Sequence, residues 1–193
     1  MIGIACIVEG HGEVAALPEL IRRIFLELIP GCYPKVVAPI RIHRDKLTKE
    51  GEVERAVQLA AAKVTPNGAV LILIDADKEC PVELAAALKE RATRARSDLP
   101  ITVVIAQCEY EAWFIAAARS LSLLPDHEQP PANPEGIRGA KEWVSKRLPL
   151  GKYSETADQP SLTATMSLDE ARRAPSFDKL VRELIALAQR AAT

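Results

Sequence analysis

The chain has 193 residues, of which 48% are hydrophobic and 26% are charged, and its formal net charge is −1. This length suits one α/β domain with a small appendage. A net charge near zero excludes a general electrostatic attraction to nucleic acid, so phosphate binding requires a local basic patch or a metal ion.

The four cysteines, Cys6, Cys32, Cys80 and Cys108, are far apart and form no Cys-x-x-Cys pair, which excludes a zinc ribbon. No apolar run approaches the roughly 20 residues of a membrane span. The apolar start of the chain lacks a basic flank and ends at Glu9, so it is too short for a secretory signal. We expect a soluble protein in the reducing cytoplasm, without a membrane partner.

Residues 1–124 alternate between strand and helix patterns. Short runs rich in Ile and Val, bounded by turn residues, predict buried parallel strands, and apolar residues at helical spacing predict the helices between them. The expected strands are 2–8, 36–42, 69–75 and 101–106. The first expected helix ends near residue 29, and three further helices cover 50–64, 82–94 and 109–123. Pro18 fits best in the first turn of the first helix. The order predicts an α/β fold with a parallel sheet of about four strands flanked by helices.

The composition changes after Leu124. Residues 125–134 contain four prolines and predict a loop, 136–148 a short helix, 149–167 a polar region rich in turns, and the residues from Ser176 a final amphipathic helix. We interpret 125–193 as an elaboration packed on the 1–124 core.

Acidic residues follow two of the predicted strands. Glu9 ends the first strand, and Asp75 and Asp77 follow the third. Ligands of open α/β sheets bind beyond the carboxyl ends of the strands, so we expect these carboxylates to meet at one edge. Such oxygen ligands suit Mg²⁺ or Mn²⁺. The alternative is a solvated turn in which Asp75 or Asp77 caps the next helix and Glu9 is a loop acid.

Further polar residues lie near the same edge. Glu109 and Glu111 follow the fourth strand, and Glu109 is the better candidate ligand because it is nearer the strand end; both could instead be first-turn acids favoured by the helix dipole. His11 could donate to a phosphate or be a simple loop histidine. His43 and Arg44 follow the second strand and could bind phosphate or belong to a solvated loop.

A basic stretch lies in the C-terminal third. Its positive residues, set against Glu142, are Arg138, Lys141, Lys146, Arg147 and Lys152. Such a stretch could follow a phosphate backbone, or it could be a solvated helix face. We select Arg147 and Lys152 as the candidate substrate-binding residues.

Three segments carry a resemblance to a known family: IVEGHGEVAALPELIRRI from Ile7, VLILIDADKE from Val70, and CEYEAWFIA from Cys108. A strand followed by Glu-Gly and a helix, and a later strand ending in Asp-x-Asp, resembles the Toprim domain of topoisomerases, primases and OLD-type nucleases. With the segment that begins KYSETADQ at Lys152, nearly the whole chain is similar to the bacterial Toprim-like family called domain of unknown function 4276.

The resemblance implies Mg²⁺-dependent chemistry on a phosphodiester, with Glu9, Asp75 and Asp77 as the catalytic residues and Glu109 as a further metal ligand. The chain is too short for strand passage and lacks a primase module, so we expect nuclease-like hydrolysis of nucleic acid, DNA before RNA, in phage defence or DNA repair. Two other classes stay open. One is a non-catalytic Toprim-like module that partners a separate ATPase, and the other is a receiver-like or phosphatase-like domain with an acidic Mg²⁺ edge.

Overall fold

A computed structural model describes residues 1–64 and 68–191. These residues form a five-stranded sheet that is parallel throughout. β1 (Ile2–Val8) lies between β4 (Ala69–Asp75) on one side and the short strands β2 (Pro34–Val36) and β3 (Ile40–Arg41) on the other, and β5 (Ile101–Ala106) is the edge beyond β4. The predicted α/β fold with a Rossmann-like parallel sheet is confirmed.

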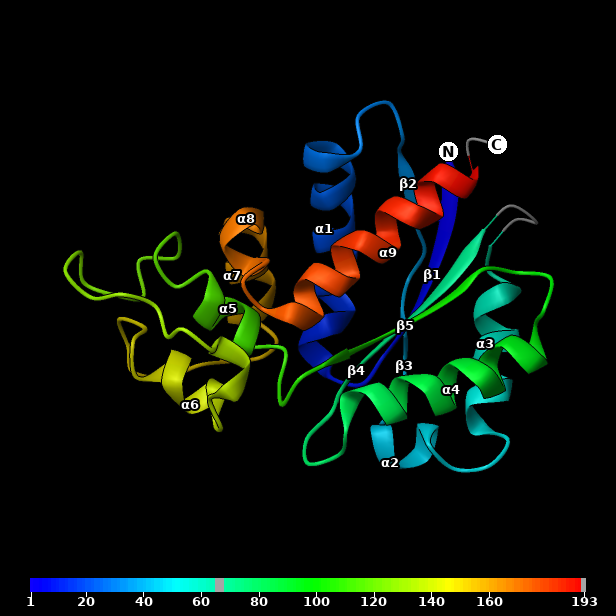
Figure 1. The fold of residues 1–193 in the computed structure, drawn as a ribbon, viewed down its shortest axis with the longest axis horizontal. Coiled ribbons are helices and arrows are strands. Elements are labelled where there is room, and N and C mark those ends of the chain that lie inside the picture. The colour runs from blue at the N-terminus through cyan, green and yellow to red at the C-terminus, as the bar shows by residue number, and fades with distance from the viewer. Residues whose placement is uncertain (65–67, 192–193) are drawn as a thin grey trace.

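Helices cover both faces of this sheet. Their bounds are α1 (His11–Leu28), α2 (Arg44–Leu47), α3 (Glu52–Ala61), α4 (Pro81–Ala95), α5 (Ala112–Ala116), the 3-10 turn η1 (Pro134–Gly136), α6 (Ala140–Ser145), α7 (Asp158–Thr165), α8 (Leu168–Ala171) and α9 (Pro175–Ala191). Figure 1 shows α1 and α9 on one face, and α3 and α4 on the other. The segment with α5 to α8 lies beyond the end of the sheet toward which the strand arrows point.

Two hydrophobic cores follow from the alternation of side chains along each buried strand. Ile4, Cys6 and Val8 of β1 pack into the core shared with α1 and α9, whereas Ala5 and Ile7 face the core built by α3 and α4. Both faces are buried, so the strands read as continuous apolar runs rather than as alternating ones. Three of the predicted strands, 2–8, 69–75 and 101–106, have the observed bounds.

The second predicted strand, 36–42, is interrupted and becomes β2 and β3, which both pair with β1. Pro39 lies in the gap, and proline has no N–H to donate to a ladder. Pro18 lies inside α1 rather than in its first turn, because the helix already begins at His11.

The region after β5 departs further from expectation. The predicted helix 109–123 contains only α5, and the chain adopts positive φ values of 64° at Cys108 and 54° at Ser122 on either side of it. The region 149–167, expected to be turns, contains α7, which packs along α1.

The C-terminal third shares a core with the sheet. The Trp113 indole donates to Ser176 Oγ over 2.8 Å, and its ring lies 5.2 Å from that of Phe177 at the start of α9. The expected division at residue 124 stays a prediction. None of the helices within the described ranges combines the length and apolar character needed to cross a membrane.

Candidate functional site

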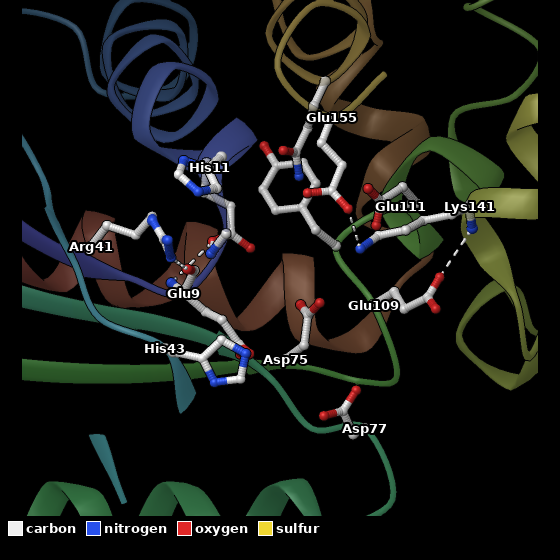
Figure 2. A pocket seen from close by; sticks show the side chains of 14 residues that line it. Glu9, His11, Arg41, His43, Asp75, Asp77, Glu109, Glu111, Lys141 and Glu155 are labelled. Carbon is white, nitrogen blue, oxygen red and sulfur yellow. Dashed lines mark hydrogen bonds and ion pairs between the residues drawn. The ribbon is translucent and has the colours of Figure 1, made fainter. Parts of the chain in front are cut away.

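The carboxyl ends of β1, β4 and β5 open into one polar cavity of about 310 Å³. Its lining residues come from these strand ends, from α1 and from the C-terminal third, and they are Glu9, Gly10, His11, Glu13, Arg41, His43, Asp75, Asp77, Glu109, Tyr110, Glu111, Lys141, Glu155 and Gln159. Figure 2 shows the Asp75 side chain pointing from the end of β4 toward the group formed by Glu111, Lys141 and Glu155, with Asp77 farther out. We call this the acidic cavity.

Glu9 and Asp75 are placed by neighbouring strands. Asp75 is the last residue of β4 and lies opposite Ala106 of β5, and Glu9 directly follows β1. Glu9 Oε2 and Asp75 Oδ1 are buried and have no hydrogen-bond partner. Burial raises the pKa of both carboxyl groups, and neighbouring carboxylates raise it further, Asp77 beside Glu9 and Glu13 beside Asp75.

Glu13 closes the start of α1. Its Oε2 accepts the backbone N–H of Glu9 over 3.1 Å and that of Gly10 over 2.6 Å, so it satisfies two donors that the helix start leaves free. The side chain is buried, and this burial raises its pKa to about 7. Because Glu13 ties down the Glu9–Gly10 backbone, it positions the Glu9 side chain at the cavity.

Glu111 reaches the same cavity from the turn after β5. Its Oε1 accepts the Tyr153 hydroxyl over 2.8 Å, while its Oε2 is buried and has no partner. Burial raises the pKa of Glu111 to about 7, although the charge of Lys141 and the Tyr153 hydroxyl act in the opposite direction. Burial and the Glu111 carboxylate together raise the pKa of Tyr153, so its hydroxyl remains a donor.

Lys141 brings a positive charge to the cavity. Its Nζ forms an ion pair with Glu155 over 2.7 Å, and its backbone N–H donates to Glu109 Oε2 over 3.0 Å. Burial alone lowers the pKa of Lys141, but Glu155, Glu111 and Asp75 raise it by more. The ammonium group is therefore charged beside the buried acids.

Asp77 is turned toward a different partner. It adopts φ +51° and accepts from Nη1 of the buried Arg44 over 2.9 Å, and Arg44 Nη2 pairs with Glu79 over 2.5 Å. The Asp77 side chain is 57% exposed. Glu9, Asp75 and Asp77 therefore meet at one sheet edge as predicted, but only Glu9 and Asp75 carry buried oxygens that lack a partner.

The other predicted residues divide into two groups. His11 and His43 line the acidic cavity. The expected loop at His43 and Arg44 is instead the start of α2, which begins at Arg44. Arg147 and Lys152 do not line it. The Arg147 guanidinium stacks 3.6 Å from the Trp143 ring centroid and lies 3.8 Å from Glu128, and Lys152 is exposed. Their role in substrate binding stays a prediction.

The donor set fits a divalent cation. Glu9, Asp75 and Glu111 each present a buried carboxylate oxygen without a partner, and such groups require a proton or a cation. Carboxylate oxygens are the ligands that Mg²⁺ and Mn²⁺ take. Within residues 1–64 and 68–191, however, no three His, Cys, Asp or Glu side chains are already arranged as a metal centre. A cation could be held here only if side chains moved toward it.

Four residues of the acidic cavity were not predicted as such from the sequence. Glu13 and Glu155 were not selected at all, the burial of Glu111 was not expected, and Lys141 was not expected at the cavity. Only Glu13 had a local signal, since an acid three residues after a helix start is typical of a capping box. Glu155 reaches the cavity because α7 packs against α1 at Gly12, where any β-carbon would collide with Gln159 and with the Glu155 carbonyl.

Comparison with known proteins gives a family but no described relative. No curated protein and no solved structure matches the chain significantly. The family model described as "Domain of unknown function (DUF4276)" matches residues 8–185, a range that contains every residue of the acidic cavity. The chain therefore belongs to the DUF4276 family.

Proposed function

We propose that the acidic cavity binds Mg²⁺ or Mn²⁺ and that the protein hydrolyses phosphodiester bonds of nucleic acid. One observation carries this proposal: three buried carboxylate oxygens, Glu9 Oε2, Asp75 Oδ1 and Glu111 Oε2, line one cavity and have no partner. A site that only had to be stable would pair these oxygens with donors, because an unpaired buried acid is costly.

Glu9, Asp75 and Glu111 would hold the cation, with Asp77 and Glu109 at the cavity wall as further carboxylates. A divalent cation here would polarise the phosphate and would allow a bound water to lose its proton near neutral pH. Lys141 is the charged donor at the cavity, and its ammonium group would contact a phosphate oxygen of the bound substrate. His11, exposed at the start of α1, would donate to another phosphate oxygen.

Two further features support this proposal. The Glu-Gly and Asp-x-Asp segments lie at neighbouring strand ends of a parallel sheet, in the order of the Toprim domain that they resemble. All four cysteines are free thiols, which suits the reducing cytoplasm where a nuclease of DNA repair or phage defence would act. We propose that the substrate is DNA rather than RNA.

The experiment is a cleavage assay on single-stranded, duplex and nicked DNA and on RNA, with Mg²⁺, with Mn²⁺ and with a chelator. We expect cleavage only with metal, and a loss of at least a hundredfold in Asp75→Asn, which keeps the shape and removes the charge. Asp126→Asn is the matched control, since Asp126 is exposed in a loop away from the cavity. Cleavage that survives both the chelator and Asp75→Asn would contradict the proposal.

The alternative of a non-catalytic module that partners a separate ATPase makes a different prediction. It requires no metal in the cavity, so the buried carboxyl groups of Glu9, Asp75 and Glu111 would have to be neutralised by protons alone. If no substrate is cleaved, with or without the products of neighbouring genes, and metal binding is also absent, that alternative is favoured.

A further inference from the structure

A second cleft adjoins the acidic cavity and is larger, at about 640 Å³. The two share Asp77 and Glu109 as lining residues, so they adjoin at these side chains. The second cleft, which we call the basic cleft, is lined by Arg44, Ala76, Asp77, Lys78, Glu79, Pro81, Gln107, Cys108, Glu109, Arg138 and Gly139. It lies between the turn after β4 and the segment that leads into α6.

The two spaces differ in charge. Among the described residues, the acidic cavity is lined by seven carboxylates against the two permanent cations Arg41 and Lys141. The basic cleft is lined by three carboxylates and three cations. A polyanion is repelled by the first space unless a metal is bound there. The second space carries no net charge, and because Arg44 pairs with Asp77 and Glu79, it leaves the cations Lys78 and Arg138 against Glu109 alone.

Lys78 is held at this cleft by a buried anchor. Its two neighbours, Asp77 and Glu79, both bind the Arg44 guanidinium, through Nη1 and Nη2. Arg44 is 8% exposed, so the turn is fixed from the protein interior and its two acids are already neutralised in part. Lys78 itself is exposed between them.

Arg138 lines the same cleft from the segment that leads into α6. It is exposed, and it precedes Gly139, whose φ of +71° starts α6. In the part of the chain that the structure describes, neither Lys78 nor Arg138 forms a salt bridge. Both cations are therefore available for a ligand, unlike Arg44 and Arg147, which are already paired within the protein.

We propose that the basic cleft binds the phosphodiester backbone next to the scissile bond, with Lys78 and Arg138 each contacting a phosphate of the strand. This proposal rests on the proposed function and adds the path of the substrate: from the acidic cavity, over Asp77 and Glu109, into the basic cleft. Arg147 and Lys152, the residues selected from sequence, line neither space and are not on this path.

The test compares two double variants for binding to a fluorescently labelled 20-nucleotide DNA strand, with Ca²⁺ in place of Mg²⁺, over a series of salt concentrations. Lys78→Ala with Arg138→Ala removes the cleft cations, and Lys49→Ala with Lys89→Ala removes two exposed cations that line neither space. Removing one cation that binds a phosphate flattens the salt slope by about 0.7 unit and weakens binding about fivefold at 0.1 M salt, so the cleft variant should bind about 25-fold more weakly.

The control variant should stay within about twofold of the wild type, and Lys78→Arg should retain binding, because a charge at that position is what the cleft supplies. Thermal melting should be unchanged in all variants, since exposed charges contribute little to stability. The same binding titration with an RNA strand of the same sequence shows which of the two nucleic acids the protein binds more tightly.

The outcomes separate the two proposals. If the wild type binds but the cleft variant keeps the wild-type slope, or the control variant is weakened as much, the cleft is not the path and the proposed function stands. If the wild type binds neither DNA nor RNA even at low salt, the proposed function fails and the cleft proposal fails with it.

Discussion

The Tyr153 hydroxyl donates to Glu111 Oε1 over 2.8 Å and thereby connects the C-terminal third of the chain to the acidic cavity. The Lys141–Glu155 ion pair makes a second connection. The strand ends of the sheet supply Glu9 and Asp75, but part of the cavity wall, Lys141, Glu155 and Gln159, comes from residues after 124. A fragment limited to the sheet would therefore lack part of the site.

Replacing Tyr153 with Phe removes the only donor to Glu111 Oε1 within the described residues. We expect a loss of about 1 kcal/mol in the free energy of unfolding, because a buried acceptor loses its partner. Divalent-metal affinity should fall several-fold, since Glu111 is no longer held in place. Chemical denaturation and calorimetric metal titration measure the two effects. Tyr33→Phe, at an exposed position, is the control and should change neither.

Glu109 and Glu111 should contribute unequally to metal binding. Glu111 is buried with one unpaired oxygen, whereas Glu109 is less buried and accepts the Lys141 backbone N–H. We expect Glu111→Gln to weaken Mn²⁺ binding at least tenfold and Glu109→Gln to weaken it about threefold or less. Titration of both variants under one set of conditions checks this. Equal losses, or a larger loss for Glu109→Gln, would contradict the assignment.

The metal-free protein should lose stability as the pH rises from about 4.5 to about 7. Burial raises the pKa of Glu13 and Glu111 from 4.5 to about 7, so the folded chain binds more protons than the unfolded chain in this window. Stability therefore decreases as these protons leave. Mg²⁺ should offset the loss most strongly above pH 7, because it binds the deprotonated acids.

Melting in a chelator at pH 5, 6, 7 and 8, and again with Mg²⁺, measures this dependence. The Glu111→Gln variant should show a shallower pH dependence, because one of the two groups no longer titrates. A melting temperature that rises steadily with pH in the chelator would show that these acids are not buried as described.

Gly12→Ala should separate α7 from α1. The added β-carbon would collide with Gln159 and with the Glu155 carbonyl, and we expect a destabilisation of about 1–3 kcal/mol. Since Glu155 holds Lys141, metal affinity should also fall. Ala15→Ser, on the exposed face of the same helix, is the control for denaturation and titration. Wild-type stability in Gly12→Ala would mean that α7 does not pack here.

The sequence predicts the sheet better than it predicts the cavity. The bounds of β1, β4 and β5 follow from buried Ile and Val runs between turn residues, and Glu9 and Asp75 follow from the strand ends. These are local signals. They also explain why the acids were expected at one edge, where the structure places them.

The remaining features depend on contacts between residues distant in the sequence. Glu111 lines the cavity and accepts from Tyr153, 42 positions later, and the turn before it includes φ +64° at Cys108, which a non-glycine residue does not signal. Asp77 turns outward because Arg44, 33 positions earlier, binds it. Glu155 arrives through the packing of α7 on α1, in a region whose polar composition indicated only turns.

The most direct test of the central claim is calorimetric titration of the chelator-treated protein with Mn²⁺, comparing the wild type, Asp75→Asn and Asp126→Asn. Asp75 carries a buried oxygen without a partner in the middle of the cavity, and Asp126 is an exposed loop acid. We predict saturable binding in the wild type and in Asp126→Asn, and its loss in Asp75→Asn with the fold intact. Equal binding in all three proteins, or none in the wild type, would contradict a metal site at the acidic cavity.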